Sequence, residues 1–211
     1  MEALELKEKT ESLLLKEGIP VNKHLPKIES ISELSFAPAA NIRQRAVALS
    51  YILARAFGAP IDMVQNSINE YHLENIFLPQ ELEFINQANP PKEDSEQYQL
   101  GVESLWELAW VLGLIPKVSH SSYCGNNLAH LVPKPGEDPS EFLASTQMRS
   151  HEEIYEEADL LYRVHWASRE AYLTGSPEPT GVPEYVIEQR HKAINWVSYG
   201  EASWNEVDTS T

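Results

Sequence analysis

The chain has 211 residues, 42% of them hydrophobic, enough to bury the core of one large domain. Its 16 Lys and Arg residues stand against 32 Asp and Glu residues, which gives a net charge of −16. Such a surface repels phosphate backbones and anionic lipid headgroups, so we expect neither nucleic-acid nor membrane-surface binding. The partner can still be a basic protein, a cation or a neutral small molecule. Alternatively, the acidic surface serves only to keep the protein soluble.

Other features of the composition bear on the cellular compartment. The first residues lack the basic start, apolar core and cleavage site of a signal peptide. No run reaches the roughly 20 apolar residues that a membrane-spanning helix needs. The one cysteine, Cys124, excludes an internal disulfide and fits a reducing compartment. We therefore expect a cytoplasmic protein.

Helical periodicity and helix-end signals recur along most of the chain, and no convincing strand pair or internal repeat is present. The expected helices, in chain order, cover residues 3–17, 38–58, 61–72, 79–87, 95–112, 139–144, 150–175 and 183–199. Residues 19–37 indicate an ordered crossing segment, and the proline-bearing residues 89–97 indicate a loop. The tail, 201–211, can pack through Trp204 or be extended. The fold class is therefore mainly α, with about eight helices. Residues 1–18 are expected to form an N-terminal helix and residues 19–211 a single domain, and the sequence leaves open whether that helix packs on the domain or is peripheral.

The stretch from Ser150 to Gly175 is expected to be the central helix. Ser150 and Glu153 form a capping box, and Gly175 provides the left-handed stop. Two apolar stripes predict burial on more than one side. They consist of Ile154, Ala158, Leu161, Ser168 and Tyr172, and of Leu160, Val164, Ala167 and Ala171. The run Glu152, Glu153, Glu156 and Glu157 is expected to be a solvated first turn that complements the helix dipole.

Several segments resemble a known family. They are HLPKIES at 24–30, RAVALSYILARAFG at 45–58, FLPQELEFI at 77–85, ESLWELAWVLGLI at 103–115, RSHEEIYEEADLLYRVHWASREAYLTG at 149–175, RHKAINWVSYG at 190–200 and the terminal SWNEVDTST. From about residue 20 onward the chain is similar to the bacterial domain-of-unknown-function family 4272. The resemblance implies a soluble bacterial protein of a family without an established activity, and it provides no catalytic residues to carry over.

The last two long helices allow a geometric prediction. A short proline-rich loop joins them, so they should lie antiparallel as neighbours. His165 precedes Leu173 by eight residues, and His191 follows Pro183 by eight, which places both about 12 Å from the turn. His165 follows Leu161 on one apolar stripe and His191 lies between Ile187 and Ile194 on another, so both should point inward and lie close together. Asp159 is placed to pair with Arg163, and His191 with Asn195, at i,i+4 spacing.

Two interpretations of this cluster stay open. In the functional one, His165, His191 or Glu188 performs proton transfer in a polar pocket that binds a ligand. The candidate ligand-binding residues are Arg163, Arg169, Arg190, Asn195, Trp166 and Trp196. In the structural one, the same residues form a satisfied buried network that fixes how the two helices dock. The sequence favours the structural interpretation.

No metal or cofactor is expected. Glu188 and His191 have the spacing of a di-iron ligand pair, but no second copy exists and chance alone yields about one such pair. Cys124 lies near His120 and His130, which would suit a thiolate nucleophile, yet an unreactive cysteine is the ordinary interpretation. Phosphate-binding, dinucleotide-binding and nucleophile-elbow motifs are missing from the sequence.

Two hypotheses for function follow. The first is a non-enzymatic module that binds a protein or a small ligand. The second is an enzyme that acts on a small anionic substrate through a pocket of histidines and arginines between the last two long helices. The sequence leaves open whether the protein is an enzyme, and the oligomeric state.

Overall fold

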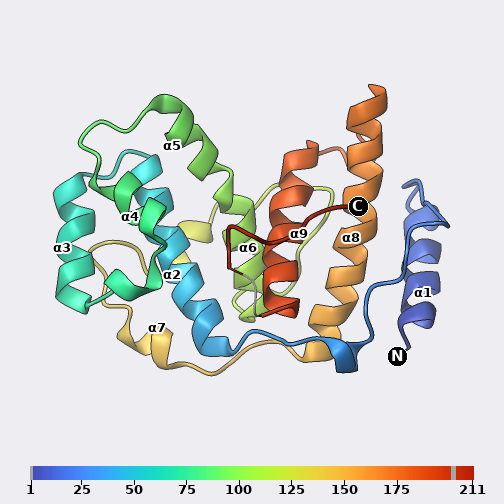
Figure 1. Ribbon diagram of the computed structural model, residues 1–211, viewed down its shortest axis with the longest axis horizontal. Helices are drawn as coiled ribbons and strands as arrows, with labels where there is room; N and C mark the ends of the chain where they lie inside the picture. The colour runs from blue at the N-terminus through green and yellow to red at the C-terminus, as the bar shows by residue number, and fades with distance from the viewer. Residues whose placement is uncertain (1, 201–202) are drawn as a thin grey trace. The chain divides into compact units, whose positions relative to one another are not determined.

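The computed structural model describes residues 2–200 and 203–211, and every regular element in these residues is a helix. The expectation of a mainly α fold is therefore confirmed (Figure 1). The part of the predicted tail that covers residues 201–202 lies outside the described residues. Within the described residues, no helix combines the length and the apolar character needed to cross a membrane.

The chain divides into two compact units. The first contains residues 1–37, 116–123 and 149–211, and the second contains residues 38–115 and 124–148. Helix α1 (Ala3–Lys16) packs against α8 (His151–Thr174) in the first unit. The single domain expected over residues 19–211 stays a prediction.

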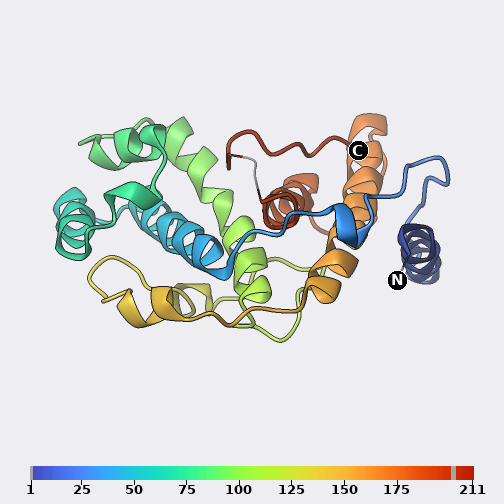
Figure 2. The same ribbon diagram turned by 60° about the horizontal axis from the view of Figure 1, so that its bottom comes forward.

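In the first unit, α8 and α9 (Glu184–Ser198) lie side by side and antiparallel, as the sequence predicts (Figures 1 and 2). The Ser150 hydroxyl accepts a hydrogen bond from the Glu153 N–H, and the Glu153 carboxylate accepts one from the Ser150 N–H. Gly175 ends α8 with a φ of +66°. Both predicted helix-end signals are thus confirmed.

The two apolar stripes of α8 are buried except at two positions. Tyr172 is 71% exposed, because the last turns of α8 extend beyond α9 (Figure 1), and Leu160 is half-buried. The acidic run is exposed except at Glu157, which is only partly exposed. Burial raises the pKa of Glu157 to about 7, although Arg190 and Arg149 oppose the shift. The expectation of a fully solvated acidic turn is wrong at this residue.

The segment between α1 and the second unit crosses the first unit and includes a short 3₁₀ helix, η1 (Ile31–Glu33). The Tyr155 hydroxyl donates a hydrogen bond of 3.0 Å to the carbonyl of Glu29, and the Ala37 N–H donates one of 2.7 Å to the carbonyl of Val197. These bonds anchor the crossing segment to α8 and α9, which matters for the pocket described below.

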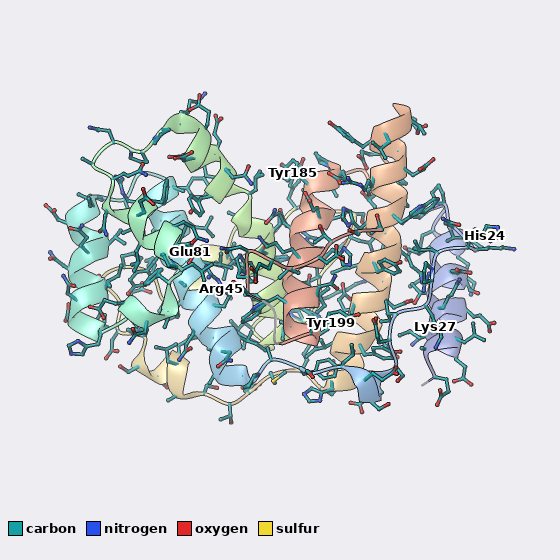
Figure 3. All side chains as sticks on the ribbon, in the orientation of Figure 1. His24, Lys27, Arg45, Glu81, Tyr185 and Tyr199 are labelled. Carbon is teal, nitrogen blue, oxygen red and sulfur yellow. The ribbon has the colours of Figure 1, made fainter. Side chains whose placement is uncertain are left out.

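The second unit is built around α2 (Ala39–Ala56), which contacts each of the other α-helices of the unit. These are α3 (Ile61–Tyr71), α4 (Pro79–Asn86), α5 (Lys92–Gln99), α6 (Gly101–Val111) and α7 (Ser140–Ala144), with the 3₁₀ helices η2 (Glu74–Ile76) and η3 (Leu128–His130). Arg45 of α2 donates two hydrogen bonds to the Glu81 carboxylate of α4, at 3.1 and 2.7 Å (Figure 3). This buried ion pair joins the two helices.

The single helix expected over residues 95–112 differs in two ways: it is divided at Leu100 into α5 and α6, and it begins earlier than predicted. The sequence predicts a loop at 89–97 and a helix from residue 95, but α5 already begins at Lys92. Pro91 precedes the helix, and Glu93 and Asp94 in its first turn interact favourably with the helix dipole. These helix-starting signals prevail over the polar, loop-like composition of the segment.

Candidate functional site

The two histidines meet between α8 and α9, as predicted. The Nδ1 atoms of His165 and His191 lie 2.9 Å apart, and the two rings cross edge to face with centroids 5.1 Å apart. His165 is 0% exposed and His191 1% exposed. The prediction that His165 and His191 lie at the same distance from the turn and meet is therefore confirmed.

A chain of hydrogen bonds extends from this pair in both directions. On one side, His165 Nε2 lies 3.2 Å from a Glu184 carboxylate oxygen, which Arg169 also contacts at 3.3 Å. On the other side, the Asn195 amide nitrogen lies 3.0 Å from His191 Nε2 and donates to the carbonyl of Asp208, also at 3.0 Å. The predicted pairing of His191 with Asn195 is confirmed.

The partners assign the tautomers of both rings. The Asn195 amide nitrogen can only donate, so His191 Nε2 accepts and the ring hydrogen lies on Nδ1. That hydrogen is donated to His165 Nδ1, so His165 carries its own hydrogen on Nε2 and donates it to Glu184. All four ring nitrogens therefore have partners, with both rings neutral.

The environment keeps the pair neutral. Burial, together with the neighbouring His165, lowers the pKa of His191 to about 3. Burial also lowers the pKa of His165, although Glu184 opposes the shift. At neutral pH neither ring brings a positive charge to the interface.

The three candidate arginines bind carboxylates or backbone carbonyls of the first unit itself. Arg163 donates two hydrogen bonds to Asp159, at 2.9 and 2.7 Å, which confirms the predicted pair. It also donates one to the carbonyl of Pro26. Arg190 donates to the carbonyls of Ser119 and Ser122, at 2.6 and 2.8 Å. Since Arg169 faces Glu184, the geometry gives no support to an arginine clamp for an anion.

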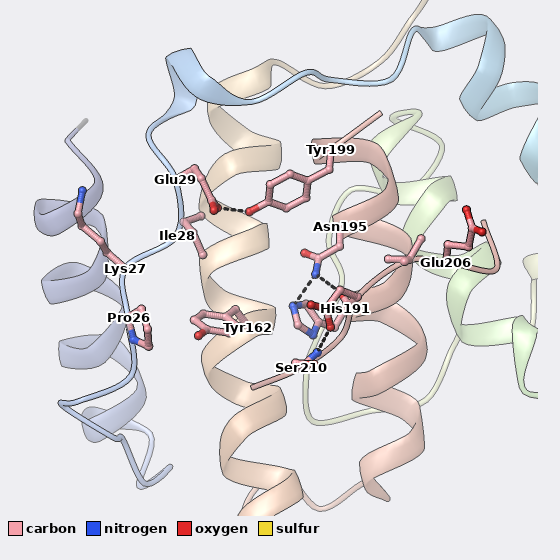
Figure 4. Close-up of a pocket in the computed structure, with 12 residues that line it drawn as sticks. Pro26, Lys27, Ile28, Glu29, Tyr162, His191, Asn195, Tyr199, Glu206 and Ser210 are labelled. Carbon is pink, nitrogen blue, oxygen red and sulfur yellow. Dashed lines mark hydrogen bonds between the residues drawn. The ribbon is translucent and has the colours of Figure 1, made fainter. Parts of the chain in front are cut away.

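A pocket of about 440 Å³ opens beside the histidine pair in the first unit (Figure 4). Its walls are residues 26–29 of the crossing segment, Tyr162 of α8 and the α9 residues His191 and Asn195, with Tyr199 following α9. The tail completes it with residues 206–208 and 210. Polar and aromatic groups from distant parts of the chain thus converge on one cavity.

The tail is held in place by specific contacts. The Trp204 ring packs edge-on to Trp196, with centroids 5.5 Å apart, and the Lys192 ammonium lies 5.2 Å from the centroid of the Trp204 ring. The hydrogen bond from Asn195 to the Asp208 carbonyl fixes the segment that follows. The pocket wall formed by the tail is therefore built on α9.

The candidate residues of the sequence separate into two groups. His191 and Asn195 line the pocket, whereas His165 lies behind His191. The other candidates are not part of the lining: Glu188, Arg163, Arg169, Arg190, Trp166 and Trp196. Sequence reasoning missed Tyr162, Tyr199 and the tail. The aromatic residues follow the helical spacing of His165 and His191, but no pattern in the tail indicates its position.

Cys124 and the residues that follow it belong to the second unit, where the Cys124 N–H donates to the Glu103 carboxylate at 3.0 Å. In the first unit, His120 lies 2.9 Å from the Glu17 carboxylate. Among the side chains of residues 2–200 and 203–211, no group of three or more His, Cys, Asp or Glu could hold a metal ion. A catalytic role for Cys124 stays an untested hypothesis.

The comparisons with known proteins agree with the resemblance seen in the sequence. The family described as Domain of unknown function (DUF4272) matches residues 6–207. No match was found among curated proteins or among solved structures. Because the family match covers nearly the whole chain, the chain belongs to the DUF4272 family.

Proposed function

We propose that the protein is a binding module for a small organic ligand, and that the pocket beside His191 is its binding site. The observation that supports this most is the pocket of about 440 Å³, which is within the range of small-molecule sites. It combines apolar and aromatic surface with a few convergent polar groups, as ligand sites do.

The pocket walls are preorganised, which favours binding. Tyr155 holds the backbone of Glu29, and Tyr199 donates a hydrogen bond to the Glu29 carboxylate. Asn195 holds both the His191 ring and the tail. Little side-chain freedom at these positions is left to be lost when a ligand binds.

The proposal also includes the cellular compartment of the protein and the kinds of molecule that it binds. A cytoplasmic, bacterial protein fits the single cysteine and the family resemblance, and a charge of −16 favours a partner other than nucleic acid or an anionic membrane. A protein partner that covers the pocket would also fit this site. Binding of isolated fragments separates the two kinds of partner, because a protein-only interface does not bind them at a defined site.

A fragment screen followed by protein NMR tests the binding site. We expect hits to shift the resonances of His191, Asn195 and Tyr199. The Val207→Trp substitution fills the pocket and should lower fragment affinity by about tenfold or more, a difference of about 1.4 kcal/mol. Leu173→Trp is the matched control, because Leu173 is 68% exposed on α8 and does not line the pocket. Equal affinities for Val207→Trp and wild type would refute the proposed site.

An enzyme remains the second candidate, favoured by the hydrogen-bonded chain from His191 through His165 to Glu184. On this path Asn195 first releases His191 Nε2; a proton taken up there displaces the Nδ1 hydrogen to His165, and the Nε2 hydrogen of His165 passes to Glu184. The proton would then reside on a carboxylate, and no buried imidazolium would persist. This path does not supply the anion-binding clamp of the original hypothesis.

The fragment mixtures also test this second candidate. An enzyme should convert some bound fragments over hours, which NMR of the mixtures detects as new signals. His165→Gln should abolish that conversion while fragment binding persists, because an amide side chain at this position cannot relay a proton. Fragments that bind and stay chemically unchanged would count against catalysis.

A further inference from the structure

We infer that the ligand of this pocket is an organic cation with N–H donors, that is, a primary or secondary amine in its ammonium form. The inference rests on the proposed function, because it assigns a ligand class to the same pocket. Three features of the lining support it: the hydrogen-bonding groups, the charges and the aromatic rings.

Three polar side chains of the lining, those of Asn195, Tyr199 and His191, have their donor hydrogens already used. Both amide hydrogens of Asn195 are donated, to His191 and to the Asp208 carbonyl, which leaves the amide oxygen as an acceptor. The Tyr199 hydroxyl hydrogen is donated to Glu29, which leaves lone pairs on the phenol oxygen. His191 has a partner at each ring nitrogen and provides no free donor. A ligand that supplies donors complements these groups.

The charged residues of the lining also favour a cationic ligand. The lining includes three acidic residues, Glu29, Glu206 and Asp208, against one basic residue, Lys27, and in Figure 4 the Glu206 carboxylate points away from His191. Hydrogen bonds from the Ser210 side chain and N–H lower the pKa of Asp208, so this carboxylate is ionised at neutral pH. In Figure 4 the Lys27 nitrogen points away from Tyr162 and His191. The lining therefore attracts a cation and repels an anion.

The aromatic rings give an ammonium group a further favourable surface. Tyr162 and Tyr199 both line the pocket, and Figure 4 shows the Tyr199 ring beside Glu29 and the Tyr162 ring below Ile28. A cation within about 6 Å of a ring centroid gains electrostatic stabilisation from the ring quadrupole. The Arg163 guanidinium lies 5.8 Å from the Tyr162 centroid, so this ring already interacts with one cation. The combination of aromatic rings and carboxylates suits amines better than neutral polar molecules.

Three probes of similar shape test the charge preference by isothermal titration calorimetry: benzylamine, benzyl alcohol and benzoate. They differ in the charge and hydrogen-bonding capacity of one group. We expect benzylamine to bind about tenfold or more tightly than benzyl alcohol, as a charge-assisted hydrogen bond implies, and benzoate to bind most weakly. Added salt should weaken the binding of benzylamine only, because it screens the carboxylates.

A double substitution assigns the preference to the pocket. Glu29→Gln with Asp208→Asn removes two negative charges but retains acceptor oxygens for Tyr199 and Ser210. We expect it to lower benzylamine affinity by about tenfold and to leave benzyl alcohol affinity unchanged. Glu152→Gln with Glu156→Gln is the matched control, because both side chains are exposed on α8 and neither lines the pocket.

The possible outcomes separate the ligand class from the binding site. Benzyl alcohol or benzoate binding at least as tightly as benzylamine overturns the cation inference but keeps the pocket as a binding site. Benzylamine binding that the double substitution leaves unchanged also overturns it. If none of the three probes binds at millimolar concentration, both the inference and the proposed function fail.

Discussion

A buried histidine whose two ring nitrogens both have partners cannot take up a proton without losing one of its hydrogen bonds. His191 is in this situation, because Nδ1 donates to His165 and Nε2 accepts from Asn195. Protonation at Nε2 would place two donors face to face. At the scale of single residues, the site therefore depends on neutral imidazoles and should be sensitive to acid.

This dependence gives a pH prediction. The pKa of His191 is about 3 in the folded protein and about 6.5 in the unfolded chain, so the unfolded chain binds more protons between these values. The free energy of unfolding should therefore fall as the pH decreases below about 6.5. This one group contributes a slope of up to about 1.4 kcal/mol per pH unit. Urea denaturation at several pH values between 5 and 8 measures the slope.

Two variants separate this effect from general acid instability. His191→Gln removes the titrating group, so its stability should depend less steeply on pH than that of the wild type. His24→Gln is the control, because His24 is exposed and projects from the loop after α1 (Figure 3). The explanation fails if the slope is the same for His191→Gln and the wild type.

A second residue-scale prediction concerns the ion pair of Arg163 and Asp159. Asp159 is 0% exposed and Arg163 2% exposed, so Asp159→Asn leaves a buried guanidinium without its full counter-charge. We expect the free energy of unfolding to fall by about 3 kcal/mol or more. The control has the same i,i+4 spacing at the surface, where Lys92 and Glu96 are 84% and 57% exposed. Glu96→Gln should cost about 0.5 kcal/mol or less, and equal losses in a denaturation assay would contradict this account.

At the scale of helices, much of the site could be predicted from the sequence. The helix-end signals of α8 and the proline-rich loop before α9 set the register, and counting residues from that loop placed His165 opposite His191. The i,i+4 rule found the partners of Arg163 and His191 within their own helices. Local periodicity is sufficient for such contacts, because they depend on one helix or on two adjacent ones.

Contacts from irregular segments could not be predicted in the same way. The carbonyls of Ser119 and Ser122 engage Arg190, and the tail forms one wall of the pocket, yet neither segment has a periodic pattern. Backbone carbonyls also carry no sequence signal, since every residue has one. The sequence therefore leaves the arginines as candidates for a ligand beside the structural interpretation that it favours, and the structure shows that Arg163 and Arg190 bind groups of the protein itself.

A close approach of two backbone segments gives a prediction at this scale. A Cβ atom at Gly200 would clash with the carbonyl oxygen of Ser35 and lie 2.9 Å from the Ala37 nitrogen. Neither backbone atom can move as a side-chain end can, so Gly200→Ala should lower the free energy of unfolding by about 1–3 kcal/mol.

The control for this substitution is Gly101, the first residue of α6. A Cβ atom at Gly101 in α6 would meet only the side chains of Leu49 and Leu53, at 3.8 and 3.9 Å. Gly101→Ala should therefore stabilise by about 0.5–1 kcal/mol. Chemical denaturation of both variants measures whether the free energy of unfolding falls for Gly200→Ala and rises for Gly101→Ala. A Gly200→Ala variant as stable as the wild type would refute the close approach.

At the scale of the whole chain, the pocket depends on segments far apart in the sequence. Residues 26–29 come before η1, Tyr162 lies in α8, and residues 206–208 and 210 belong to the tail. The Trp204 contacts and the hydrogen bond from Asn195 attach the tail to α9. Binding and tail attachment should therefore be coupled: a change that releases the tail removes a pocket wall, although it does not touch the ligand.

Trp204→Ala tests this coupling. The substitution removes the edge-on packing against Trp196 and the contact with Lys192, so the tail should detach from α9 more often. We expect benzylamine affinity to fall by about tenfold, which corresponds to about 1.4 kcal/mol, and limited proteolysis to cut the tail faster. Tyr172→Ala removes an exposed aromatic side chain outside the pocket and should change neither measurement. Faster cleavage of the Trp204→Ala tail with unchanged affinity would show that the tail is not a functional wall, and the binding site would then be limited to the crossing segment and the two helices.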